Sequence, residues 1–182
     1  MKRSSQIIIS FFLFALIGLV SCQPASVLES GKMLQLAAST ENYVDVTIAL
    51  ERGENDQFFL SATFTPQASS LHLYSKDIPK TGINGLGRPT LLELSKDSPM
   101  QAISGLTESA SPQPPATPPF ELLTYPAGVV TLSLRILLPN GNSWINDEVI
   151  VTYMACNEQG CRPPVQQKPI AIKIPGRELF QQ

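Results

Sequence analysis

The chain has few of the residues that metal sites and charged ligands require. It contains three cysteines and a single histidine, His72, among 182 residues. A zinc site takes about four ligands, so Cys156, Cys161 and His72 fall short, and we predict neither a metal nor another cofactor. Charged residues make up 15 % of the chain, the net charge is −2 and no dense basic patch is present, which argues against nucleic-acid binding. The sequence also has no Ser-His-Asp arrangement and no phosphate-cradling glycine motif.

Long apolar runs are scarce as well, and the main one lies at the N-terminus. Ile7 to Val20 follows Lys2 and Arg3, and it is shorter than the roughly 20 apolar residues of a comfortable membrane span. A basic start, a short apolar run and small residues at its end are typical of a secretory signal peptide. We therefore predict that residues 1–21 are a signal peptide and that the mature chain is extracytoplasmic.

The end of this segment, Leu19-Val20-Ser21-Cys22, resembles the bacterial lipobox. In a lipobox the cysteine is lipidated and becomes the first residue after cleavage, so we predict lipidation at Cys22 and attachment to a bacterial membrane. The alternative is an ordinary signal peptide in which Cys22 has no role. Gln23 follows instead of the aspartate that usually signals inner-membrane retention. The expected location is therefore the periplasmic side of the outer membrane, if the cell is Gram-negative.

The composition of the mature chain favours an all-β domain. Proline is abundant, at 16 residues, and strand-forming runs recur at short spacing. Residues 22–40 are expected to be a tether, although Val27 to Ala38 fits either a short helix or a first strand. Residues 41–176 are then expected to form one domain, followed by a frayed tail at 177–182.

Alternation of apolar and polar residues places the strands. The clearest case is Val129 to Leu138, in which every second residue from Val130 onwards is apolar. The other predicted strands are 43–50, 58–64, 71–74, 90–94, 148–154 and 165–174, and the first two are expected to pair as a hairpin. About eight short strands separated by turn signals favour an immunoglobulin-like β-sandwich. A small closed barrel is the alternative.

A proline-rich segment interrupts this pattern. Residues 108–119 hold five prolines, so they favour extended conformations and cannot form a central strand. Too few residues follow for a comfortable second domain, and the strands that follow need partners. We therefore interpret the segment as a long functional loop on a single domain rather than as a linker.

Cys156 and Cys161 have four residues between them and lie between two strand-forming runs, which predicts a hairpin with a four-residue turn. If the cysteines form a non-hydrogen-bonded pair, their Cα atoms lie roughly 4.5 Å apart, within the range that a disulfide accepts. The interpretations are a structural disulfide, a redox-active pair or two free thiols. A bridge here closes a ring of about six residues and is worth only about 2 kcal/mol. Pro163 and Pro164 limit strand pairing after Cys161 and keep its sulfur near a rim.

The run Tyr153-Met154-Ala155-Cys156, four residues, then Cys161-Arg162-Pro163-Pro164 resembles the active-site hairpin of the N-terminal (alpha) domain of the thiol:disulfide interchange protein DsbD. A weaker resemblance extends over residues 43–174 and includes His72-Leu73-Tyr74. The family fold is an immunoglobulin-like sandwich. His72 itself is interpreted as a surface residue of its strand.

The resemblance implies a relay of reducing equivalents by thiol-disulfide interchange. Cys161 would form mixed disulfides with partners and Cys156 would be the resolving thiol. Family members also have a cap loop with an aromatic residue, and Phe120, at the end of the proline-rich loop, is the candidate here; the alternative is that Phe120 belongs to the core. The implied partners are a thioredoxin-like redox protein or a membrane electron conduit as donor, and an extracytoplasmic client with a disulfide. Since neither donor domain follows in this sequence, the donor is expected to be another polypeptide.

A second hypothesis comes from a different functional class. The chain can be a non-catalytic β-sandwich lipoprotein that binds a protein partner, with Cys156–Cys161 as a structural disulfide. The redox potential of the pair separates the two hypotheses, because structural disulfides lie below about −300 mV and exchanging ones lie higher.

Overall fold

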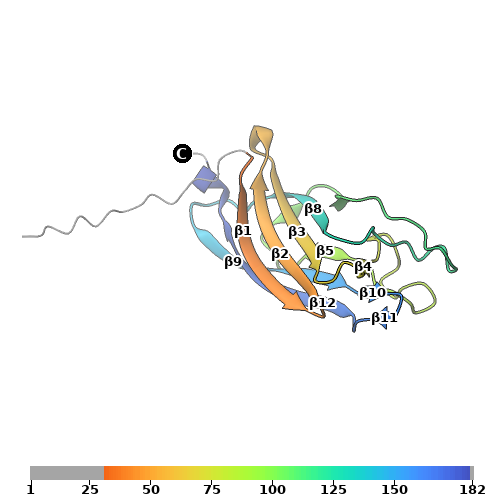
Figure 1. The fold of residues 1–182 in the computed structure, drawn as a ribbon. Helices are drawn as coiled ribbons and strands as arrows, with labels where there is room; N and C mark the ends of the chain where they lie inside the picture. Colours follow the sequence, from red (N-terminus) through yellow and green to blue (C-terminus); the bar gives the residue numbers. More distant parts are fainter. Residues whose placement is uncertain (1–30, 181–182) are drawn as a thin grey trace, which may run out of the picture.

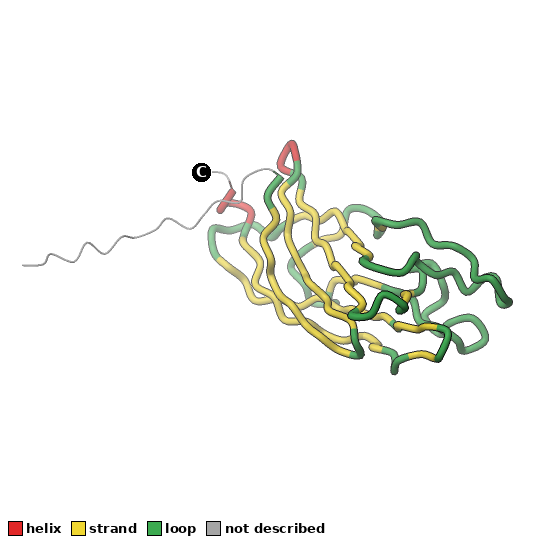
Figure 2. The backbone as a smooth tube through the Cα atoms, viewed as in Figure 1, coloured by secondary structure: helices red, strands yellow, loops and turns green. Residues whose placement is uncertain are grey.

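The computed structural model describes residues 31–180, and almost all of its regular structure is β-strand (Figures 1 and 2). The long strands are β1 (Met33–Glu41), β2 (Val44–Arg52), β3 (Phe58–Pro66), β5 (Leu91–Leu94), β8 (Val130–Leu137), β9 (Trp144–Tyr153) and β12 (Val165–Pro175). The short ones are β4 (His72–Leu73), β6 (Gln101–Ala102), β7 (Thr107–Glu108), β10 (Ala155–Asn157) and β11 (Gly160–Cys161). Two 3-10 turns, η1 (Glu54–Asp56) and η2 (Arg177–Phe180), complete the described elements. Within residues 31–180 no helix has the length and apolarity that a membrane crossing requires.

Two antiparallel sheets pack against each other as a sandwich (Figure 1). The larger sheet has the order β1-β2-β3-β8-β6, with β7 also paired to β8, and the second sheet has the order β12-β9-β5. The alternation expected for Val129 to Leu138 is confirmed, because buried and more exposed residues alternate along β8. The expected β2–β3 hairpin is present, with Ile48 opposite Ala62. The all-β sandwich predicted from the sequence is therefore the fold of the described domain.

One continuous apolar core lies between these sheets. Ile48 and Leu60 from the larger sheet and Val149 and Ile174 from the second are fully buried members of the same cluster. Burying a side chain of this size is worth about 1.5–3 kcal/mol, so strands of both sheets contribute to holding the layers together. Because of this core, the sandwich is a rigid scaffold for the loops and short strands at its ends.

The predicted tether extends too far along the chain. Met33–Glu41 forms β1, an edge strand paired with β2 from Met33↔Glu51 to Glu41↔Val44. Of the helix and the strand that the sequence left open for part of this segment, the strand is therefore correct from Met33 onwards. Only a few of its side chains reach the core, which explains why its apolar alternation is weak. The signal peptide at 1–21 and Cys22 lie outside the described residues.

The expected frayed tail is also wrong for residues 177–180. The 3-10 turn η2 places Phe180 against Phe58, with the ring centroids 4.8 Å apart. The guanidinium of Arg52 lies over the Phe180 ring, 5.6 Å from its centroid. Burial of this aromatic side chain helps to hold the short segment on the sandwich, together with the hydrogen bonds that the N–H groups of Arg177 and Glu178 donate to the carbonyls of Pro139 and Gly141.

A third, smaller sheet has the order β11-β10-β4. Strand β9 leads directly into β10 after Met154, and β11 leads back into β12 after Pro163 and Pro164. The cysteine hairpin is therefore the far end of the long β9–β12 hairpin, and it lies at one end of the sandwich (Figure 1).

The proline-rich segment forms a long loop on this single domain. We call residues 109–124 the proline-rich arm. The N–H of Gln113 donates to the Thr124 carbonyl at 2.8 Å and the N–H of Thr124 donates to the Gln113 carbonyl at 2.9 Å. At the base of the arm the Tyr125 hydroxyl donates to Glu108, and the N–H of Tyr125 donates to the Leu73 carbonyl at 2.8 Å. The return limb of the arm consequently lies beside β4.

Candidate functional site

Cys156 and Cys161 are joined by a disulfide, and they stand directly opposite each other on β10 and β11. Their Cα atoms are 4.0 Å apart. The hairpin is tighter than predicted, because Asn157 pairs with Gly160 and leaves a two-residue turn instead of four. The side-chain oxygen of Asn157 accepts from the N–H of Gln159 at 3.0 Å and closes this turn.

The cysteines form the non-hydrogen-bonded kind of antiparallel pair. The N–H of Arg162 donates to the carbonyl of Ala155 at 2.8 Å, so the ladder hydrogen bonds flank the Cys156–Cys161 pair instead of joining it. This is the pairing in which opposite side chains come closest, and it brings the sulfurs within bonding range. Pro163 and Pro164 follow without backbone donors, so β11 ends at once.

The two cysteines differ sharply in exposure. Cys156 is only 2 % exposed, whereas Cys161 is exposed. Cys156 belongs to a small apolar cluster, which we call the Cys156 cluster: Tyr74, Ile78 and Cys156 form its buried part, and Leu122, Leu123 and Met154 pack against it. Cys161 is therefore open to solvent, whereas Cys156 is covered by protein atoms.

Tyr74 is the polar group closest to the disulfide. Its hydroxyl donates to the sulfur of Cys156 at 3.1 Å and lies 3.8 Å from the sulfur of Cys161. Burial raises the pKa of Tyr74 above its ordinary value, which keeps the phenol protonated and able to donate. Tyr74 is a residue of the site that the sequence did not indicate. The available signal was its position on the strand, pointing away from the core residue Leu73.

His72 is not the surface residue that the sequence indicated. It is partly buried, and the register places it opposite Cys156 on β4. Its ring meets the ring of Tyr74 edge to face, with centroids 5.6 Å apart. Burial lowers the pKa of His72, so the imidazole is mainly neutral at pH 7 while the disulfide is intact.

The turn between β1 and β2 holds the strand that follows Cys161. The side-chain amide of Asn42 donates to the carbonyl of Pro163 at 2.9 Å. The guanidinium of Arg162 lies 4.4 Å from the centroid of the Tyr43 ring, a cation–π contact. Nearby, the Tyr153 hydroxyl donates to the Glu41 carbonyl at 3.1 Å. These contacts fix the base of the cysteine hairpin to the larger sheet.

Phe120 lies on the proline-rich arm and is 56 % exposed. The alternative that it is a core residue is therefore wrong. Leu122 and Leu123, which follow on the return limb, are the arm residues that pack against the Cys156 cluster. The arm thus packs against the cluster that contains Cys156 through these leucines, and the role of Phe120 as a cap residue stays a prediction.

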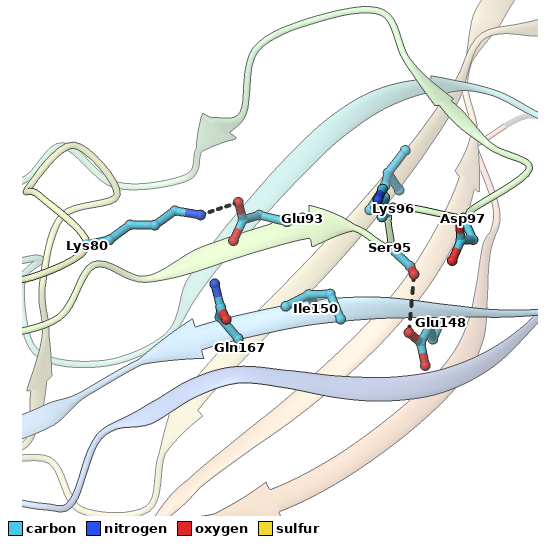
Figure 3. A pocket seen from close by; sticks show the side chains of 9 residues that line it. Lys80, Glu93, Ser95, Lys96, Asp97, Glu148, Ile150 and Gln167 are labelled. Carbon is cyan, nitrogen blue, oxygen red and sulfur yellow. Dashed lines mark hydrogen bonds and ion pairs between the residues drawn. The ribbon is translucent and has the colours of Figure 1, made fainter.

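A surface hollow lies away from the disulfide. It has a volume of about 460 Å³ and is lined mainly by polar side chains from residues 93–97, β9 and β12 (Figure 3). Lys80 pairs with Glu93 at 2.7 Å, and Ser95 donates to Glu148 at 3.2 Å across the hollow. Neither cysteine lines it. We place the candidate chemistry at the disulfide, because sulfur exchange needs an exposed sulfur and not an enclosed pocket.

No group of three or more histidine, cysteine or acidic side chains suited to a metal occurs within residues 31–180. Comparison of the chain with protein-family models, curated proteins and solved structures finds no match. The geometry of the site therefore carries the functional argument. It shows a disulfide at the edge of a small sheet, with one cysteine exposed, the other buried, and a phenol hydrogen-bonded to the buried one.

Proposed function

We propose that the chain is an extracytoplasmic thiol-disulfide interchange carrier that transfers reducing equivalents through Cys156 and Cys161. The observation that carries this proposal is the unequal exposure of the two cysteines. Interchange proceeds through a mixed disulfide, so one sulfur must be open to a partner and the other must stay within reach to resolve it. A disulfide that serves only as a staple has no need of this asymmetry.

Reduction of a client begins at Cys161. Its thiolate attacks a client disulfide, forms the mixed disulfide and releases one client sulfur as a thiolate. The thiolate of Cys156 then attacks the sulfur of Cys161, which releases the second client sulfur and restores the Cys156–Cys161 bond. The client gains two electrons and the domain loses two.

Recharging of the domain reverses these steps. A donor thiolate attacks the exposed sulfur of Cys161, and Cys156 departs as a thiolate beside the Tyr74 hydroxyl. A hydrogen bond to an ionised group is roughly twice as strong as one between neutral groups, so Tyr74 stabilises the leaving group more than it stabilises the disulfide. The donor's second thiolate then attacks the donor sulfur held on Cys161, which completes the donor disulfide and frees Cys161.

The resemblance to the alpha domain of DsbD supports the same assignment, with Cys161 as the exchanging and Cys156 as the resolving residue. We propose that a thioredoxin-like protein or a membrane electron conduit is the donor and that an extracytoplasmic protein with a disulfide is the client. We also propose that lipid on Cys22 attaches the chain to a bacterial membrane, on the periplasmic side of the outer membrane in a Gram-negative cell. In this proposal the proline-rich arm is the cap, with Phe120 as its candidate aromatic residue.

A redox titration tests the proposal. The purified mature chain is equilibrated in thiol-disulfide buffers of known potential, and free cysteines are counted after alkylation. We expect a potential above about −300 mV, the upper limit of structural disulfides. A pair that stays oxidised at potentials which reduce extracytoplasmic oxidoreductases would instead support the non-catalytic lipoprotein with a structural bond.

Trapping of mixed disulfides in cells tests the two roles separately. The Cys156→Ser variant keeps the exposed Cys161 and should accumulate mixed disulfides with a thioredoxin-like protein. The matched Cys161→Ser variant keeps only the buried Cys156 and should trap far less. Equal trapping by both variants, or none by either, would contradict the assigned roles.

A further inference from the structure

His72, Cys156 and Cys161 form one row across the smaller sheet. Cys156 is paired with Cys161 on one side and with His72 on the other. Side chains directly opposite each other on antiparallel strands point to the same face, with Cβ atoms about 4.5–5.5 Å apart. The imidazole therefore extends from the position next to the buried sulfur, on the same face as the disulfide.

The contact with Tyr74 supports this placement independently. Tyr74 stands two residues after His72, so both side chains point to one face of β4, and their rings meet edge to face. The hydroxyl of Tyr74 reaches the sulfur of Cys156 at 3.1 Å. The phenol and the imidazole consequently lie on the same side of the sheet as this sulfur.

We propose that His72 holds the proton that balances the charge of the Cys156 thiolate when the disulfide is reduced. The inference rests on the proposed function and concerns which group carries the proton in the reduced site. A donor dithiol supplies two electrons and two protons and becomes a disulfide. The S–S bond of the domain breaks, one proton goes to the sulfur of Cys161 and the other to the imidazole of His72. The product is a thiolate-imidazolium pair at Cys156 and His72.

Burial supplies the physical reason for this pairing. A lone thiolate at a position that is 2 % exposed is costly, because the surroundings solvate its charge poorly. A cation within about 4–6 Å offsets that cost, and such a pair shifts a pKa by about 1–3 units. In the oxidised state nothing anionic stands opposite His72 on β10, and burial lowers its pKa. Reduction of the disulfide should instead raise the pKa of His72.

The other groups facing His72 can be named from the register. On its own strand and on β10 and β11 these are the phenol of Tyr74 and the two cysteines. On the return limb of the arm Thr124 pairs with Tyr74, and its hydroxyl does not titrate in water. Glu158 lies in the exposed turn two residues after Cys156, and it is the carboxylate to be controlled for.

The single histidine of the chain makes the test direct. The imidazole C–H signal of His72 is followed by NMR against pH in the oxidised chain and in the chain reduced with a phosphine, which requires no partner protein. We expect the proton affinity of His72 to rise about tenfold or more on reduction. An unchanged titration midpoint would overturn the proposal and would leave the interchange function, which the redox titration measures, unaffected.

Three variants identify the source of the shift. In reduced Cys156→Ser, which has no thiolate at that position, the midpoint should stay at the oxidised value, whereas reduced Cys161→Ser should keep the shift. Glu158→Gln should leave the shift unchanged. A shift that persists in Cys156→Ser, or that disappears in Cys161→Ser or Glu158→Gln, would contradict the pairing.

A second experiment measures the ionisation of the Cys156 thiol. The chain is expressed without Cys22 and with the Cys161→Ser substitution. Cys156 is then the only cysteine left, so it alone contributes thiolate absorbance near 240 nm. His72→Gln should weaken the acidity of Cys156 by about tenfold. An acidity equal to that of the parent would refute a role for the imidazole.

Discussion

Replacement of Tyr74 by phenylalanine tests how the buried sulfur is stabilised. The substitution removes a hydroxyl that donates to Cys156 at 3.1 Å and keeps the ring in the Cys156 cluster. A hydrogen bond to a charged group contributes about 1.5–3 kcal/mol and one to a neutral acceptor about 0.5–1.5 kcal/mol. The reduced form with a Cys156 thiolate therefore loses about 1–2 kcal/mol more than the disulfide form.

The sign of the change in redox potential depends on whether the reduced or the oxidised form loses more stabilisation. Because the reduced form is destabilised, Tyr74→Phe should make the disulfide harder to reduce. For a two-electron couple 1.4 kcal/mol corresponds to about 30 mV, so the potential should fall by about 20–40 mV. The measurement is equilibration with glutathione followed by alkylation, with thermal unfolding of the oxidised variant as the control for folding. A potential that is unchanged or less negative would refute the reasoning.

Three further predictions concern stability. Reduction of Cys156–Cys161 should lower the free energy of unfolding by only about 2 kcal/mol, measured by urea unfolding of both forms, and a domain that unfolds on reduction would contradict this. Burial, with a smaller electrostatic contribution, raises the pKa of Tyr153 to about 12 against about 10 in the unfolded chain. Between these pH values the folded state binds more protons than the unfolded state, so the free energy of unfolding should fall as pH rises from about 10 to about 12. A free energy of unfolding that does not change over this pH range would contradict the prediction. Leu60→Ala, at a fully buried position, should cost about 2–5 kcal/mol, while Phe120→Ala on the exposed arm should stay within about 0.5 kcal/mol.

The sandwich was predictable because its strands have one face in the core and one face towards solvent. In β8, Val130 and Leu132 are buried while Thr131 between them is less so, and the sequence shows the same period of two. The cysteine pair was predictable for a similar local reason, since a short separation between two strands brings the residues opposite each other. The core strands and the cysteine pair could therefore be predicted from local sequence patterns.

The features that the sequence did not reveal depend on contacts between distant segments. Tyr74 and Cys156 are 82 residues apart, and no local spacing indicates that β4 pairs with β10. The docking of Phe180 on Phe58 likewise joins two segments that are far apart in the sequence. Strand β1 is an edge strand that buries little, so its apolar period is too weak to separate strand from tether. The turn after Asn157 was misjudged by two residues, because pairing of Asn157 with Gly160 depends on backbone hydrogen bonds and not on side-chain polarity.

The direction of β1 has a practical consequence. The strand starts at Met33, opposite Glu51, and reaches the cysteine end of the sandwich at Glu41. Nine strand residues span roughly 30 Å, and Phe180 lies against Phe58 at the Met33 end as well. Both ends of the described domain thus emerge from the pole opposite the disulfide (Figure 1). Any attachment made through either end, whether to a surface, a resin or a fused protein, leaves the exposed Cys161 at the far end, separated from the attachment by the full length of the sandwich.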